Sequence, residues 1–181
     1  REAAKLMRTL ETHGITLEML DIGGGFPGFY GKKLPSIAEY GEHITKTLAA
    51  ELPYKVRVVA EPGRYIAANA GVLTTTVIGV AERAGKTWMH LDVGAFNGVM
   101  EALETQNTLR FPVTDSLDAT QKTLYNLTGP SCDSQDSILF DVSLSAGLKV
   151  GDTVFIHSTG AYTTCYASTF NGFEIPKTFY K

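Results

Sequence analysis

Apolar residues recur at helical spacing in two separate segments of the chain. In the first segment the recurrence stops at Gly14, a residue type that commonly follows a helix end. Ser36 and Glu39 open the second segment as a capping box, a pattern that marks a helix start. The apolar positions are Ala3, Leu6, Met7 and Leu10 in the first segment, and Ile37, Tyr40, Ile44 and Leu48 in the second. Two amphipathic helices are therefore predicted.

Strand patterns fill most of the remaining chain and change in character near Gly71. Residues 16–22 and 55–60 each follow a predicted helix, so the opening third alternates helix and strand. After Gly71, threonine, valine and isoleucine dominate four segments at 73–80, 88–93, 137–142 and 153–157. The helix–strand alternation before Gly71 is typical of a parallel sheet with helices. The β-rich pattern after Gly71 is typical of an antiparallel β-barrel or β-sandwich. We therefore expect two domains, residues 1–70 and residues 71–181.

Composition narrows the class of partner. The 181 residues are 44% hydrophobic and 19% charged with a formal net charge of −3, which is a globular balance. The longest run of basic residues is the pair Lys32 and Lys33, so neither a nucleic acid nor a membrane surface is expected as a partner. No apolar stretch approaches the roughly 18 residues that a membrane helix needs, and a cytoplasmic location is expected. Cys132 and Cys165 lack the spacing of a disulfide framework or a metal site.

Gly23, Gly24 and Gly25 follow the first predicted strand directly. Consecutive glycines at a strand end present bare backbone N–H groups that suit a phosphate. A tight strand-to-loop turn without a ligand explains the same residues. The dinucleotide pattern G-x-G-x-x-G is also satisfied, but Pro27 and a long loop replace the helix that this fingerprint requires.

Glu61 and Arg64 follow the second predicted strand. Parallel strands end at one edge of their sheet, where α/β folds collect ligands, so this pair is expected beside the glycine turn. A carboxylate and a guanidinium there suit a ligand that carries both charges. An internal Glu61–Arg64 ion pair that staples the turn is the alternative.

Two later segments also carry candidate chemistry. Cys132 and Asp133 stand together in the turn-rich stretch 129–134, which places a thiol and a carboxylate at the surface. The alternative is a small apolar cysteine beside an aspartate that only closes a turn. Aromatic residues among small ones follow at 160–163 and 170–173, where packing is the simpler explanation.

In this order, four motifs resemble the fold-type III pyridoxal-phosphate decarboxylases, and the Cys-Asp pair resembles their ornithine/lysine branch. The motifs are Leu-Asp-Ile-Gly-Gly-Gly-Phe-Pro-Gly (20–28), Glu-Pro-Gly-Arg (61–64), Gly-Pro-Ser-Cys-Asp-Ser (129–134), and Gly-Ala-Tyr-Thr with Phe-Asn-Gly-Phe (160–173). The resemblance implies a TIM (β/α)8 barrel followed by a β-domain. Such a barrel takes about 250 residues, whereas about 70 precede the β-rich part here, which is room for its last two strands. The chain thus resembles a C-terminal fragment without the lysine that forms the Schiff base, and alone it is expected to be inactive.

The resemblance also assigns roles to individual residues. Gly23, Gly24, Gly25 and Arg64 would bind the phosphate of pyridoxal 5′-phosphate, with a hydroxyl from Tyr162, and Glu61 would hold the pyridinium nitrogen protonated. Cys132 would return a proton to the substrate and Asp133 would bind its distal ammonium, both across the interface of a homodimer with shared active sites. Phe170 would line the same pocket. The segment 94–104 departs from the eukaryotic pattern, so the second substrate carboxylate is either Glu101 or Glu104.

The function implied is a carboxy-lyase that converts ornithine to putrescine or lysine to cadaverine in polyamine biosynthesis. Three alternatives are a regulatory homologue of the antizyme-inhibitor kind, a diaminopimelate or arginine decarboxylase, and an alanine racemase relative. Cys132 and Asp133 argue against the regulatory protein, because a protein that only binds needs no proton donor beside a carboxylate. The same Cys-Asp motif argues against the racemase.

Overall fold

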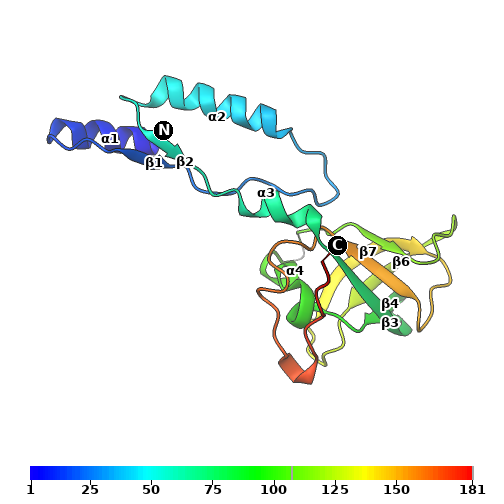
Figure 1. Ribbon diagram of the computed structural model, residues 1–181. Helices are drawn as coiled ribbons and strands as arrows, with labels where there is room; N and C mark the ends of the chain where they lie inside the picture. Colours follow the sequence, from blue (N-terminus) through cyan, green and yellow to red (C-terminus); the bar gives the residue numbers. More distant parts are fainter. Residues whose placement is uncertain (107, 181) are drawn as a thin grey trace. The chain divides into compact units, whose positions relative to one another are not determined.

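A computed structural model describes residues 1–106 and 108–180 (Figure 1). The chain divides into two compact units. Unit 1 comprises residues 1–27 and 33–63, and unit 2 comprises residues 28–32 and the chain from residue 64 onward. No helix among the described residues is both long and apolar enough to cross a membrane.

Unit 1 contains two helices and two parallel strands. These are α1 (Glu2–Thr12), β1 (Met19–Asp21), α2 (Ile37–Glu51) and β2 (Arg57–Val59), with Leu20 opposite Val58. The capping box is confirmed, because Ser36 Oγ accepts the Glu39 N–H at 3.3 Å and Glu39 Oε2 accepts the Ser36 N–H at 2.6 Å. Both strands are shorter than their sequence patterns predicted.

The apolar faces of unit 1 are poorly covered by the unit itself. The structure describes all of its residues, and only Ala4 and Met7 among them are buried. Leu6 is 58% exposed and Val58 is 41% exposed. A cavity of about 470 Å³ also lies among α1, β1 and α2. Parallel strands normally have both faces covered, so this unit lacks the packing that such strands need.

Unit 2 is built on one six-stranded sheet with the order β5-β8-β3-β4-β6-β7. Neighbouring strands are antiparallel except for the parallel pair β4 and β6. The strands are β3 (Val72–Arg83), β4 (Lys86–Leu91), β5 (Val113–Asp115), β6 (Lys122–Thr128), β7 (Ser137–Ser145) and β8 (Thr153–His157). The end strands β5 and β7 also pack together, so the sheet curls into a nearly closed barrel. The predicted β-rich half is confirmed, and β5 and β6 are additions to the four predicted strands.

The core of unit 2 fills the interior of this curled sheet. In β3, β4 and β8 the fully buried residues alternate along the strand, which is the two-residue period expected of a sheet with one buried face. In β6 and β7 consecutive residues are also buried. The largest fully buried apolar side chains are Val77, Met89, Leu91, Val99, Leu127, Ile138, Leu144, Val154 and Ile156.

Asp115 closes the seam between the two end strands. Its Oδ2 accepts the backbone N–H of Ser145 from β7 at 2.9 Å, and its Oδ1 accepts the N–H groups of Leu117 and Asp118. Burial would raise the pKa of the Asp115 carboxyl, but the hydrogen bonds from Ser145, Asp118 and Leu117 outweigh it and hold that pKa below its usual value of 3.8. The ionised side chain therefore stabilises the closed sheet.

Replacing Asp115 by asparagine should destabilise unit 2 by about 1–2 kcal/mol at pH 7, because one acceptor of a buried charged network becomes a donor. Because folding lowers the carboxyl pKa, this stabilisation is present above the unfolded pKa and is lost as the pH falls through the folded value. Urea unfolding at pH 7 and pH 3 measures the effect. A difference between wild type and variant that is equal at both pH values would contradict the assignment.

Candidate functional site

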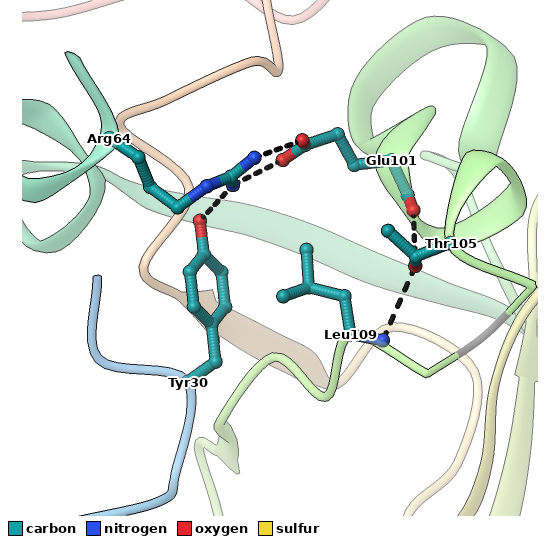
Figure 2. Close-up of polar contacts among 5 residues, drawn as sticks. All are labelled: Tyr30, Arg64, Glu101, Thr105 and Leu109. Atoms are coloured by element: carbon teal, nitrogen blue, oxygen red, sulfur yellow. Dashed lines mark hydrogen bonds and ion pairs between the residues drawn. The ribbon is translucent and has the colours of Figure 1, made fainter. Parts of the chain in front are cut away.

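Arg64, Glu101 and Tyr30 form one polar cluster inside unit 2 (Figure 2). Arg64 lies in the short helix α3 (Gly63–Ala67), Glu101 opens α4 (Glu101–Glu104), and Tyr30 comes from the loop 28–32. Arg64 Nη1 donates to Glu101 Oε2 at 2.6 Å and to the Tyr30 hydroxyl at 2.8 Å, while Nη2 donates to Glu101 Oε1. The result is a bidentate ion pair, the strongest common geometry for these two groups.

The electrostatics of the cluster follow from its partial burial. The Glu101 side chain is 8% exposed, and the Arg64 side chain is 26% exposed. The hydrogen bonds that Arg64 donates to Glu101 raise the pKa of the Arg64 guanidinium, against the opposing effect of burial, and Tyr30 adds to the rise. Arg64 therefore stays protonated at every accessible pH. Arg64 binds both carboxylate oxygens of Glu101. Of Glu101 and Glu104, the two candidates for binding the substrate amine, only Glu104 is exposed and outside the ion pair with Arg64.

Aromatic rings complete the surroundings of Arg64. Its Cζ lies 4.7 Å from the ring centroid of Tyr162 and 5.5 Å from that of Tyr30. Tyr162 also packs against Tyr166, with ring centroids 5.9 Å apart. The negative charge of Glu104 is the largest cause that raises the pKa of the Tyr166 hydroxyl. The structure thus gathers Arg64 and Tyr162, two residues whose motifs stand about a hundred positions apart.

Cys132 and Asp133 lie on the loop between β6 and β7. Cys132 is exposed, and Asn171 Nδ2 lies 3.6 Å from its sulfur as a hydrogen-bond donor. Asp133 Oδ1 accepts the backbone N–H of Gln135 at 2.8 Å, which leaves its other oxygen without a hydrogen bond among the described residues. Phe170 is 40% exposed and packs against Phe96 in a tilted arrangement with ring centroids 4.5 Å apart. The thiol and the carboxylate therefore stand at the surface beside the segment that carries Phe170.

Asp136 anchors this loop and was not singled out from the sequence. Its Oδ1 accepts the Ala95 N–H at 2.7 Å, and its Oδ2 accepts both the N–H and the hydroxyl of Ser131, at 3.0 and 2.7 Å. Asp136 is 1% exposed, so these hydrogen bonds are sheltered from water. Gly94 and Gly129 pack around the Asp136 carboxylate. In the sequence, these two glycines were the only nearby indication of a tightly packed position. The carboxylate fixes the base of the loop that presents Cys132.

Replacing Gly129 by alanine should destabilise unit 2 by about 1–3 kcal/mol, because the added Cβ would overpack a filled site. That Cβ would lie 2.4 Å from both Asp136 Oδ2 and the Gly94 backbone. Gly79→Ala is the matched control, since its Cβ would meet only ordinary contacts at 3.5 Å or more. Chemical denaturation of the two variants measures the difference. Equal stability of both would show that Gly129 is not tightly enclosed.

In unit 1, the glycine turn and Glu61 are neighbours. The Glu61 N–H donates to the Gly23 carbonyl at 2.9 Å, and a Cβ on Gly24 would lie 2.8 Å from the Glu61 carbonyl oxygen. Gly23 and Gly25 have φ of 72° and 82°, in the left-handed region that favours glycine, with open space where a Cβ would stand. The Gly23 N–H donates to Asp21 Oδ1 at 2.8 Å, which leaves the backbone N–H groups of Gly24 and Gly25 to fit an oxyanion such as a phosphate. The turn lies at the carboxyl ends of β1 and β2, as the sequence predicted.

Comparison with known proteins shows the protein family to which the chain belongs. Residues 34–160 match the family described as pyridoxal-dependent decarboxylase, C-terminal sheet domain. The chain belongs to this family, and its nearly closed sheet agrees with that domain. The family is pyridoxal-dependent, so pyridoxal phosphate is its cofactor.

Individual relatives refine the comparison. The chain is similar to the lysine/ornithine decarboxylase of Selenomonas ruminantium, with 36% identity over 97% of this chain and 44% of the relative. The crystal structure of a lysine/ornithine decarboxylase complexed with cadaverine from Vibrio vulnificus has a TM-score of 0.81 and 37% identity, covering 94% of this chain and 45% of that one. Antizyme inhibitor 2 of Xenopus laevis is 32% identical over 89% of this chain and 38% of its own length. The chain spans less than half the length of each of these proteins.

Proposed function

We propose that the protein to which this chain belongs decarboxylates ornithine or lysine, releasing putrescine or cadaverine. The observation that carries this proposal is the exposed thiol of Cys132 beside the half-buried carboxylate of Asp133, on a loop that Asp136 holds in place. A thiol that can give a proton and a carboxylate that can bind an ammonium suit a substrate with a reacting α-carbon and a distal amine. The similarity to lysine/ornithine decarboxylases supports this choice of substrate.

Bound pyridoxal phosphate would supply the electron sink that lets the α-carboxylate leave as carbon dioxide. The residues of this chain would hold and orient it. Arg64 and the backbone of Gly23, Gly24 and Gly25 would bind the phosphate with the Tyr162 hydroxyl, and Glu61 would keep the pyridine nitrogen protonated. These assignments rest on the motifs and on the fit of the glycine turn to an oxyanion.

The substrate would be handled by a second group of residues. Cys132 would return a proton to the α-carbon after carbon dioxide leaves, and Asp133 would bind the distal ammonium. Phe170 would line the pocket, and Glu104 would contribute the second carboxylate. We infer that the active unit is a homodimer with shared sites and that it works in the cytoplasm.

We also infer that residues 1–70 are part of a (β/α)8 barrel and that residues 71–181 form the β-domain that follows this barrel. The uncovered apolar faces of unit 1 support this, since further barrel strands and helices would bury Leu6, Met19 and Val58. The 181-residue chain alone should therefore have no decarboxylase activity.

The test compares the native polypeptide with the 181-residue chain. Both are supplied with pyridoxal phosphate, and carbon dioxide release is measured separately from ornithine, lysine, diaminopimelate and arginine. We expect release from ornithine or lysine by the native polypeptide only. Activity of the 181-residue chain, with one lysine adduct trapped by borohydride, would contradict the inferred dependence on a longer barrel.

A regulatory protein is the second candidate, because antizyme inhibitor 2 is also similar to this chain. Such a protein would bind a protein partner and release no carbon dioxide. Absence of release from all four amino acids, with pyridoxal phosphate present in excess, would favour this candidate over the enzyme.

A further inference from the structure

The guanidinium of Arg64 uses only part of its hydrogen-bonding capacity in the cluster of Figure 2. A guanidinium has five N–H donors, two on each Nη and one on Nε. Nη1 donates to Glu101 and Tyr30, and Nη2 donates to Glu101. Among the described residues, nothing accepts a hydrogen bond from Nε or from the second hydrogen of Nη2. These two donors share one edge of the planar group and are spaced for two oxygens of an oxyanion.

Burial shows which member of the ion pair is fixed. The Glu101 side chain is 8% exposed, and that of Arg64 is 26% exposed. The backbone carbonyl of Glu101 accepts the Thr105 hydroxyl at 2.7 Å, and the Leu109 N–H in turn donates to that hydroxyl at 3.2 Å (Figure 2). Glu101 is thus the buried and anchored partner, whereas Arg64 reaches the surface of unit 2.

The faces of the guanidinium are also restrained. The ring of Tyr162 lies over Cζ at 4.7 Å, and the hydroxyl of Tyr30 accepts from Nη1. Tyr30 is itself held by edge-to-face packing on Phe111, with ring centroids 5.3 Å apart. One edge of Arg64 is therefore bound to Glu101 and one face is covered by Tyr162, so the Nε–Nη2 edge points in a defined direction.

We propose that Glu101 is a positioning residue: it binds the Nη1–Nη2 edge of the Arg64 guanidinium and thereby orients the Nε–Nη2 edge toward a phosphate monoester. The inference rests on the proposed function, because the cofactor of that function carries such a phosphate. It also gives Glu101 a role other than binding the substrate amine. The cost of ordering a long arginine side chain is met by the fold and not by the ligand, which is how preorganisation raises affinity.

The test uses nitrogen-15 NMR of the arginine side chains in the 181-residue chain, titrated with inorganic phosphate and then with pyridoxal phosphate. Arg64→Lys identifies the Arg64 signal. We expect its Nε–H resonance to shift saturably with both probes, and its Nη resonances to be resolved because the ion pair slows their rotation. A titration that leaves the Arg64 Nε–H unmoved would overturn the inference.

Variants then separate positioning from simple charge. Glu101→Gln should lose the resolved Nη resonances and weaken phosphate binding about tenfold, the factor expected when the ligand must immobilise the side chain itself. Glu101→Asp keeps the charge and should bind with intermediate affinity, and it also serves if Glu101→Gln does not fold. Glu82→Gln makes the same change of charge at an exposed site and should bind like wild type. Unchanged or tighter binding by both Glu101 variants, or an equal loss in Glu82→Gln, would contradict the role of Glu101.

This experiment observes the Arg64 side chain directly and requires no catalytic turnover. Its outcome can therefore be distinguished from the outcome of the test of the proposed function. A saturable Arg64 shift in a protein whose native polypeptide releases no carbon dioxide would contradict the decarboxylase proposal alone. Decarboxylation that is accompanied by full phosphate affinity in the Glu101 variants would contradict the positioning role alone.

Discussion

Replacing Arg64 by alanine should destabilise unit 2 by about 3 kcal/mol, because the buried carboxylate of Glu101 would lose its partner. This loss lies at the low end of the usual range, because the Arg64 side chain is 26% exposed. Trp88, the only tryptophan, lies in β4 and reports unfolding of this unit by fluorescence. Urea titration of the variant therefore measures the loss directly.

Two further variants show whether the loss comes from the unpaired charge. Arg83→Ala removes an exposed arginine of β3 and should change stability by less than about 0.5 kcal/mol. Arg64→Ala combined with Glu101→Leu should be more stable than Arg64→Ala alone, because no buried carboxylate remains. If Arg64→Ala were no more harmful than Arg83→Ala, the ion pair would contribute nothing measurable.

Replacing Asp133 by alanine in the native polypeptide should lower kcat/KM by roughly 30-fold to several-thousand-fold. Loss of one partner from a desolvated charge pair costs about 2–5 kcal/mol. Cys132→Ala should instead lower kcat and leave KM nearly unchanged, since the thiol acts after the substrate is bound. Ser134→Ala, an exposed change in the same loop, is the control and should behave like wild type. Equal effects of the Asp133 and Cys132 changes on KM would contradict these separate roles.

Mixing two inactive variants tests whether Cys132 acts across a dimer. One chain carries Cys132→Ala, and the other lacks the lysine that binds the cofactor. Random pairing gives half heterodimers with one complete site of two, so activity should recover to about a quarter of wild type. No recovery after demonstrated subunit exchange would place the whole site within one chain.

Periodicity was enough to predict most of the fold. Both helices, the parallel pair and four strands of the barrel followed from spacing and β-branched content. The strands β5 and β6 were missed for different reasons. Residues Val113–Asp115 are too few to show alternation. In β6 the four consecutive residues 125–128 are buried, and two of them, Asn126 and Thr128, are polar, so no alternation of apolar and polar positions is visible.

The candidate site was predicted only in part, because local motifs cannot show long-range partners. Arg64 was singled out from its turn, but its partner Glu101 lies 37 positions later in a short helix with no distinctive pattern. Glu101 was named only as a candidate for binding the substrate amine. Asp136 was not named at all, and the hydrogen bond that it accepts from Ala95 crosses 41 positions. A buried carboxylate is recognised by the residues that surround it in the fold. The spacing of residues along the sequence does not show which residues those are.

The double pairing of β3 sets the order in which the barrel can form. Its second half pairs with β4 across the turn Ala84–Gly85, where both φ are positive, so this hairpin is local and should form within microseconds. Its first half, Val72 to Thr76, pairs with residues 153–157 and must wait until nearly the whole chain has been made. During that interval the first half of β3 is an open edge that can pair with other chains. A polypeptide that stops before β8 should therefore keep the hairpin and aggregate through residues 72–76.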